Sequence, residues 1–139
     1  MVTARPECAA TGVPRFRAVR GAVTVDSDSP ELIDGAVREL LAQLTGVNDV
    51  DPCDVVSAIF SATPDLRSRH PAAAARTLGW TDVPMMCVAE LEIDGMLERC
   101  VRVLLHVSVP DGRRLRPVYL GEAARLRPDL AELVTSAGR

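Results

Sequence analysis

The sequence predicts one α+β domain, a mixed β-sheet with two helices on one face and the element order β-α-β-α-β-β-β. Three observations lead to this fold class. Residues 98–109 form a β-branched run in which apolar side chains alternate with mixed ones, as in a half-buried strand. Residues 31–46 repeat apolar side chains at three- and four-residue spacing, which is typical of an amphipathic helix. The alanine-rich segment at residues 72–78 predicts a second, shorter helix.

The length of 139 residues suits one domain with a core of its own. Hydrophobic residues make up 47% of the chain, which favours a folded protein over a disordered one. Residues 1–14 show no apolar period and predict a flexible leader. Residues 15–130 are expected to form the domain, and residues 131–139 a C-terminal tail.

The composition disfavours several classes of function. A net charge of -3, with Phe16, Phe60, Trp80 and Tyr119 as the only aromatic residues, argues against a nucleic-acid partner. The four cysteines show no CxxC spacing and the two histidines lie far apart, so we expect no metal site. The chain shows neither an apolar run that could span a membrane nor a signal-peptide pattern. We therefore expect a cytoplasmic protein with free thiols and no membrane partner.

The first strand is expected at residues 16–25, with valines on one face and Arg20 on the other. A helix follows, because Ser29 can cap the free amides of a first turn and Pro30 suits the first helical position. Gly46 is expected to end this helix.

The later strands are separated by turn signals. The second strand is expected at residues 55–62, and a right-handed crossover sets it in the same sheet as the first if the two are parallel. The third strand, at residues 83–93, is followed by a turn at 94–95 and by the strand at 98–109, which is expected to be antiparallel to it. A short last strand is expected at residues 116–120.

Arg102 lies in the middle of the strand at 98–109, on the face opposite its valines. A guanidinium there either reaches water at a sheet surface or meets an anion, because an unpaired one is costly to desolvate. Arg20 and Cys87 also fit strand faces that are not simply apolar. Two helices on one face leave the other face without cover, so the sequence predicts a closed oligomer with polar sites between its subunits.

Seven motifs keep one order and spacing between about residues 16 and 130. They are Arg20-Gly21-Ala22, Ser61-Ala62-Thr63-Pro64-Asp65-Leu66, Gly79-Trp80, Val83-Pro84 with Cys87 and Glu90, Cys100-Val101-Arg102-Val103, Val118-Tyr119-Leu120 and Leu126-Arg127-Pro128-Asp129-Leu130. Together they resemble the AroH-class chorismate mutases, which are monofunctional and of the Bacillus type. Seven motifs in register are more specific than any one of them.

The resemblance implies a homotrimer in which the sheets of three subunits pack around a central barrel-like core, with active sites between neighbouring subunits. The implied reaction is the Claisen rearrangement of chorismate to prephenate, without cofactor or metal, in phenylalanine and tyrosine biosynthesis on the shikimate pathway. It makes the protein an isomerase. The implied catalytic residues are Arg102, Glu90, Arg20 and Cys87, and the substrate-binding residues are these four with Arg76, Met86, Tyr119, Leu126 and Arg127.

Each implied role matches a feature of the chemistry. Chorismate is a dianion, and arginine binds carboxylates through bidentate contacts. Negative charge gathers on the ether oxygen as the C–O bond breaks, so a fixed guanidinium there binds the transition state more tightly than the substrate. The resemblance assigns that role to Arg102, contact with the ring hydroxyl to Glu90 and Cys87, and contact with a carboxylate to Arg20 and Tyr119. It places Arg76 and Arg127 at the mouth of the site, and it implies that the segment around Leu126 and Arg127 is a mobile cover.

Plainer interpretations stand beside these roles. Tyr119 and Cys87 can serve packing alone, while Glu90, Arg76 and Arg127 can be solvated surface charges. The competing function is a non-catalytic trimeric module of similar architecture that binds a small anion or metabolite, since a fold alone does not fix a function.

Three residues depart from the family pattern. His70, Ala73 and Met86 stand where the family has an aromatic residue, a lysine and a small polar residue. These positions belong to the outer wall of the cleft, so they bear on substrate access more than on the chemistry.

Overall fold

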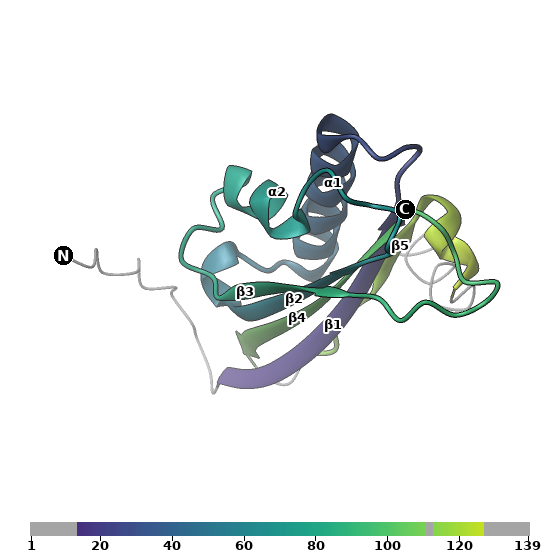
Figure 1. Cartoon of the computed structure of the whole chain (residues 1–139). Helices are drawn as coiled ribbons and strands as arrows, with labels where there is room; N and C mark the ends of the chain where they lie inside the picture. The colour runs from purple at the N-terminus through teal and green to yellow at the C-terminus, as the bar shows by residue number, and fades with distance from the viewer. Residues whose placement is uncertain (1–13, 111–112, 127–139) are drawn as a thin grey trace.

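The computed structural model describes residues 14–110 and 113–126 (Figure 1). The expected element order is confirmed. The strands are β1 (Pro14–Thr24), β2 (Val55–Ala62), β3 (Met85–Ala89), β4 (Cys100–Pro110) and β5 (Val118–Leu120), and the helices are α1 (Pro30–Asn48) and α2 (Pro71–Thr77), with 3-10 turns η1 (Pro52–Asp54) and η2 (Gly121–Arg125). Apart from Pro14, the expected leader lies outside the described residues, as do Arg127 and the expected tail.

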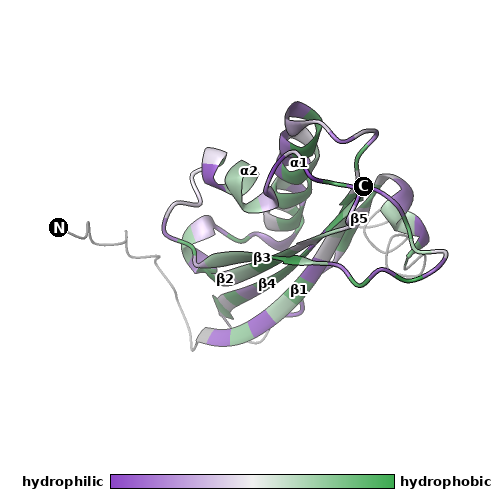
Figure 2. Ribbon diagram, viewed as in Figure 1, coloured by the Kyte–Doolittle hydropathy of each residue, from purple (hydrophilic) through white to green (hydrophobic). Residues whose placement is uncertain are grey.

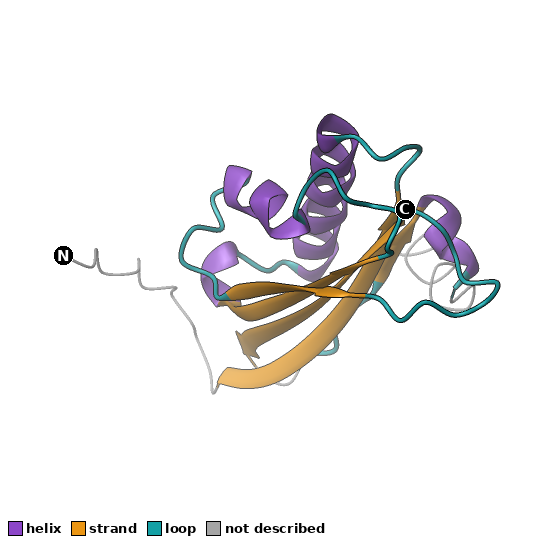
Figure 3. Ribbon diagram, viewed as in Figure 1, coloured by secondary structure: helices purple, strands orange, loops and turns teal. Residues whose placement is uncertain are grey.

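The five strands form one mixed sheet in the order β3-β2-β4-β1-β5. Strand β4 is antiparallel to both of its neighbours, whereas β1 pairs with β5, and β2 with β3, in parallel. Because β4 separates them, β1 and β2 run in the same direction, as a crossover through α1 requires. Both helices lie on one face of this sheet, as expected (Figures 1 and 3).

The core lies between the sheet and the helices. The alternating apolar residues of β4, from Val101 to Val109, are all buried, and so are Val19 and Val23 of β1. Figure 2 shows the same alternation as successive hydrophobic and hydrophilic bands along β1. Helix α1 covers these strands with side chains that are almost fully buried, among them Ile33. Burying one such aliphatic side chain contributes about 1.5–3 kcal/mol, so this layer is the main stabilising contact.

Helix α1 runs through Gly46, which was expected to end it, and stops at Asn48. Asp49 takes the left-handed conformation that closes the helix, with a φ of 50°. The Asn48 side chain explains the extension, because its Nδ2 donates to the carbonyl oxygens of Leu44 and Arg116 at 2.8 and 3.0 Å. Its Oδ1 accepts from the Arg116 amide at 2.6 Å. The helix therefore continues to the residue that ties it to the segment before β5.

Strand β3 is shorter than expected and is not hydrogen-bonded to β4. It ends at Ala89, and β2 lies between β3 and β4. The expected turn does form, with the Met96 amide donating to the Ile93 carbonyl at 3.0 Å. The amide of Glu90 still donates to Ala62 of β2 at 3.1 Å, after which the chain leaves the sheet. Residues 91–99 are a loop rather than a hairpin.

Other expectations have mixed outcomes. Strand β2 has the expected limits, whereas β5 begins two residues later than expected, at Val118. Cys87 and Cys100 are free, but Cys53 is disulfide-bonded, so the expectation of free thiols fails there. Across the described residues, none of the helices has the length and apolar character needed to cross a membrane.

Candidate active site

One row of directly paired residues crosses the whole sheet on the face away from the helices. Arg102 of β4 pairs with Ser61 of β2 on one side and with Ala22 of β1 on the other. Ser61 pairs in turn with Val88 of β3, and Ala22 with Tyr119 of β5. Directly paired residues of a sheet project from the same face. All five strands therefore contribute one residue to a single strip of surface centred on Arg102.

A cavity of about 390 Å³ lies over this row. Its lining includes Arg20, Arg102, Tyr119 and Leu126 of the expected set, with the apolar Ile59. Its size falls in the range of small-molecule sites, which combine apolar walls with a few polar groups. Arg20 and Arg102 bring two positive charges to an otherwise largely apolar wall. The cavity is thus suited to a small organic anion.

Arg102 is held by a carboxylate. Its Nε lies 3.1 Å from Glu90 Oε1, with the Arg102 side chain 47% exposed and the Glu90 side chain 17% exposed. Ser61 Oγ donates to the same Glu90 oxygen at 2.5 Å. The arginine is therefore neither buried without a partner nor simply solvated. It presents a fixed guanidinium at the cavity.

Cys100 lies beside this pair, and its thiol interacts with the Arg102 side chain. The Cys100 thiol is buried and packs with Ala22 and Ala123. Burial raises the pKa of this thiol, although the nearby charge of Arg102 acts in the opposite direction. A neutral thiol is therefore expected at Cys100 at physiological pH. It is a packing residue under the cavity rather than a nucleophile.

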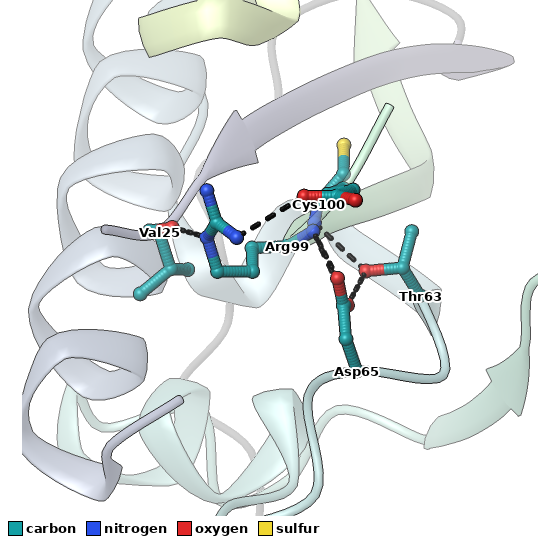
Figure 4. A network of polar contacts seen from close by, with 6 residues as sticks. Val25, Thr63, Asp65, Arg99 and Cys100 are labelled. Atoms are coloured by element: carbon teal, nitrogen blue, oxygen red, sulfur yellow. Dashed lines mark hydrogen bonds and ion pairs between the residues drawn. The ribbon is translucent and has the colours of Figure 1, made fainter. Parts of the chain in front are cut away.

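A polar network fixes the ends of the strands that carry these residues (Figure 4). Cys100 N–H donates to Thr63 Oγ1 at 2.9 Å, and Thr63 Oγ1 donates to Asp65 Oδ1 at 2.5 Å. The Asp65 carboxylate also accepts the Arg99 amide, at 2.9 Å to Oδ2. The Arg99 Nε donates to the carbonyl oxygen of Val25 at 3.1 Å. The network thus links the end of β2 to the start of β4 and to the residue that follows β1.

Gly21 lets β1 approach helix α1 closely. A Cβ at this position would lie 2.7 Å from Leu44 Cδ1 and 3.0 Å from Leu40 Cδ1. Only glycine fits without moving these buried leucines. The close approach sets the height of β1, and therefore of the neighbouring Arg20 and Ala22, on the cavity face.

Cys87 was expected, like Arg102, on a strand face that is not simply apolar, and the structure places the two residues on opposite faces of the sheet. It pairs with Phe60, which is fully buried, and it packs against the core on the helix side. Cys87 lines a second cavity of about 450 Å³ at the β3 edge, together with Arg69 and His70 of the segment between β2 and α2. Within one chain, Cys87 and Arg102 therefore belong to different cavities.

Two other expected site residues also lie apart from the Arg102 cavity. Arg76 is exposed on α2, which covers the helix side of the sheet. Met86 is 58% exposed on the edge strand β3, where it pairs with Ile59. Arg127 lies outside the described residues and follows Leu126, which lines the cavity.

Sequence reasoning assigned no role to Ser61, Ile59 or Val88, which also line the cavity. The period-two pattern of β2 puts Ser61 and Ile59 on one face. That face coincides with the face of Arg102 only once the pairing register is known, and the register was not predictable from the pattern. As for metals, the described part of the chain holds no group of three or more His, Cys, Asp or Glu residues that could bind one.

The fold and the cavity define a class, an α+β domain with an arginine-centred cavity on the sheet face away from the helices. Comparison with known proteins narrows this class. The chorismate mutase type I family model matches residues 16–130. The chain therefore belongs to the type I chorismate mutase family.

Individual relatives agree with the family match. The chain is 44% identical over 117 residues to chorismate mutase AroH of Thermus thermophilus, covering 82% of this chain and 95% of the relative. It is 42% identical over 119 residues to chorismate mutase AroH of Bacillus subtilis, covering 84% and 93%. A solved chorismate mutase from Clostridium thermocellum superposes with a TM-score of 0.74 at 36% identity, covering 78% of this chain and 98% of that one.

Proposed function

We propose that the protein rearranges chorismate to prephenate and that the Arg102 cavity forms part of its active site. Family membership and the relatives named above support the activity. The observation that carries the site is the Arg102 guanidinium, held by Glu90 at 3.1 Å over the cavity. Nothing in the comparisons supports the alternative of a non-catalytic binding module.

The rearrangement makes few chemical demands on the protein. One C–O bond breaks and one C–C bond forms within the same molecule, so no proton, electron or leaving group is transferred to the protein. The protein must hold the compact reactive conformer and stabilise the charge that develops on the ether oxygen. Arg20 and Tyr119 are assigned to a carboxylate of the substrate, and Arg102 to the ether oxygen.

Glu90 has two tasks in this proposal. Its Oε1 holds Arg102, and its carboxylate also accepts the ring hydroxyl of the substrate. Leu126 lies at the cavity, and Arg127, the next residue, is assigned to its mouth.

The site is proposed to be completed by a second copy in a homotrimer. The sheet face away from the helices carries exposed apolar side chains, with Phe16 at 74%, Met86 at 58%, Val88 at 43% and Val56 at 38% exposure. A face of this kind is typical of an interaction surface. A neighbouring subunit would place its Cys87 and Arg76, which lie apart from Arg102 within one chain, against the Arg102 cavity.

Loss of chorismate absorbance, followed in the ultraviolet with and without a chelator, tests the function. We expect turnover that does not depend on the chelator, and at least a thousandfold loss, roughly, in Arg102→Ala. Arg38 is exposed on α1, so Arg38→Ala is the matched loss of one positive charge and is expected to keep full activity. Binding of chorismate without any rearrangement would instead support the binding module.

A further inference from the structure

The two oxygens of the Glu90 carboxylate are used differently. Both Ser61 Oγ, at 2.5 Å, and Arg102 Nε, at 3.1 Å, contact Oε1. Among residues 14–110 and 113–126, no hydrogen bond or ion pair reaches Oε2. Oε1 therefore fixes the carboxylate, while Oε2 has no protein partner among the described residues.

Ser61 is well placed to orient this carboxylate. It pairs directly with Arg102 across β2 and β4, and with Val88 across β2 and β3. Its hydroxyl therefore emerges from a strand between the two groups that must be brought together, Glu90 after β3 and Arg102 on β4. The Glu90 amide also donates to Ala62 O at 3.1 Å, so the residue is anchored to β2 by its backbone and by its side chain.

We infer that Ser61 is a positioning residue for the rearrangement. Its hydroxyl fixes Glu90 Oε1, which holds the Arg102 guanidinium through Nε, and Glu90 Oε2 stays directed toward the ring hydroxyl of the substrate. The inference rests on the proposed function. Ser61 acts through Glu90, so its effect requires the Glu90 carboxylate.

The contact at Nε is important for the geometry. The terminal nitrogens of an arginine extend beyond Nε, so a carboxylate bound at Nε sets the plane of the guanidinium without covering its far end. Charge stabilisation depends on a donor that is already in place when charge develops, and a misplacement of about 1 Å can cost about a hundredfold in rate. Loss of the Ser61 hydroxyl is therefore expected to lower kcat more than it raises KM.

The test is Ser61→Ala, measured by steady-state kinetics on chorismate. We expect kcat to fall about tenfold or more while KM changes less than about threefold. Ser61→Thr keeps a hydroxyl and is expected to recover most of the loss. Ser57→Ala is the matched control, because Ser57 is on the same strand but contacts His106 Nδ1 at 3.2 Å instead of Glu90. It is expected to keep kcat within about twofold, and all variants to melt within about 3 °C of the parent.

Two further measurements separate positioning from packing. In a Glu90→Ala background, Ser61→Ala is expected to have no further effect on kcat, since residues that act as a unit are not additive. The Arg102 Nε–Hε resonance in a ¹⁵N-labelled sample is expected to shift toward that of a solvated arginine in Ser61→Ala but not in Ser57→Ala.

The outcomes distinguish this inference from the proposed function. A parent protein that does not rearrange chorismate overturns the proposed function, while the Arg102 resonance still reports whether Ser61 orients the ion pair. An active parent with full activity and an unchanged Arg102 resonance in Ser61→Ala overturns the inference alone. An undiminished effect of Ser61→Ala in the Glu90→Ala background also overturns it, because Ser61 would then act without Glu90.

Discussion

Cys87 and Arg102 lie on opposite faces of one sheet. Cys87 pairs with the buried Phe60, whereas Arg102 pairs with Ser61 beside the open cavity. No movement of side chains brings the two together within one chain, because residues on opposite faces are separated by the sheet itself. If both serve one substrate, they come from two subunits.

Subunit mixing checks this arrangement. We expect the Arg102→Ala trimer and the Arg76→Ala trimer each to lose activity, since in each variant every site lacks one of its two arginines. When equal amounts of the two variants are refolded together, about one site in four is intact, because one subunit then supplies an unmodified Arg102 and its neighbour an unmodified Arg76. Activity of the mixture should therefore rise to about a quarter of the parent value. If it stays at the mean of the two variants, each site is contained within one subunit.

Replacing Arg102 by citrulline tests its charge without changing its shape. The assigned role is to meet charge that develops only as the ether bond breaks, so turnover is expected to fall at least about a thousandfold while the substrate still binds. Lysine is expected to rescue only in part, because a single ammonium cannot reproduce the planar guanidinium. Turnover within about tenfold of the parent, which is about 1.4 kcal/mol, would show that Arg102 is only a strand residue.

Gly21→Ala is expected to destabilise the fold. The new methyl would lie 2.7 Å from Leu44 Cδ1 inside a packed core, and overpacking of this kind typically costs about 1–3 kcal/mol. Urea unfolding measures the loss. Gly35→Ala is the control, since nothing lies within 4 Å of its Cβ and it sits in helix α1, where alanine is favoured over glycine by about 1 kcal/mol. Equal stability of the two variants would contradict the close approach of β1 to α1.

Thr63→Val is expected to weaken the joint between β2 and β4. Thr63 is 3% exposed. The Thr63 hydroxyl accepts a hydrogen bond from the Cys100 amide, and the Thr63 backbone carbonyl accepts one from the Leu66 amide of the following turn. Valine keeps the shape but leaves a buried amide without a partner, which costs about 1–3 kcal/mol. Thermal unfolding should show this loss for Thr63→Val and a much smaller one for Thr63→Ser. Equal unfolding of the two variants would mean that the hydroxyl is not needed.

Asp28 gives the fold a dependence on acid pH. Hydrogen bonds, first from the Ser68 hydroxyl and then from the Arg67 and Ser68 amides, hold the pKa of Asp28 below its ordinary value of 3.8. A group whose pKa is lowered by folding contributes stability above its unfolded pKa and loses it as pH falls through the folded pKa. We therefore expect Asp28→Ala to be less stable than the parent at pH 7, with the difference shrinking below about pH 3.8. A difference that persists unchanged at pH 2 would contradict this linkage.

The sequence was sufficient for the elements whose periodicity is strong. The valine alternation of β4 and the apolar stripe of α1 predicted both their positions and their buried faces, and β2 was predicted with its observed limits. It failed where a single side chain decides the outcome. Asn48 extends α1 past Gly46 by bonding to Arg116, 68 positions further on, and no local pattern contains that contact.

The site was predictable to a similar depth. Arg20, Arg102, Tyr119 and Leu126 line one cavity, with Glu90 bound to Arg102, and their catalytic roles stay predictions. Ser61 was within a recognised motif, but its importance depends on which residue it faces. Ser61 faces Arg102 because the neighbour of β4 is β2 and not β3. The alternation of apolar and polar residues does not predict which strands are neighbours.

The sheet order has a consequence for how the molecule forms. The neighbours of β1 are β4 and β5, so the end of β1 is hydrogen-bonded to residues far along the chain. The Val25 carbonyl oxygen accepts from Arg99, 74 positions away, and Thr24 Oγ1 accepts from the Glu122 amide, 98 positions away. During synthesis β1 is made first yet has no strand to pair with until most of the chain has emerged, which leaves its edges open to other chains. Such distant pairings place folding on a timescale of roughly milliseconds to seconds. Because residues of β1, β4 and β5 line the Arg102 cavity, the cavity has no local precursor, and it should form in the same cooperative step as the finished sheet.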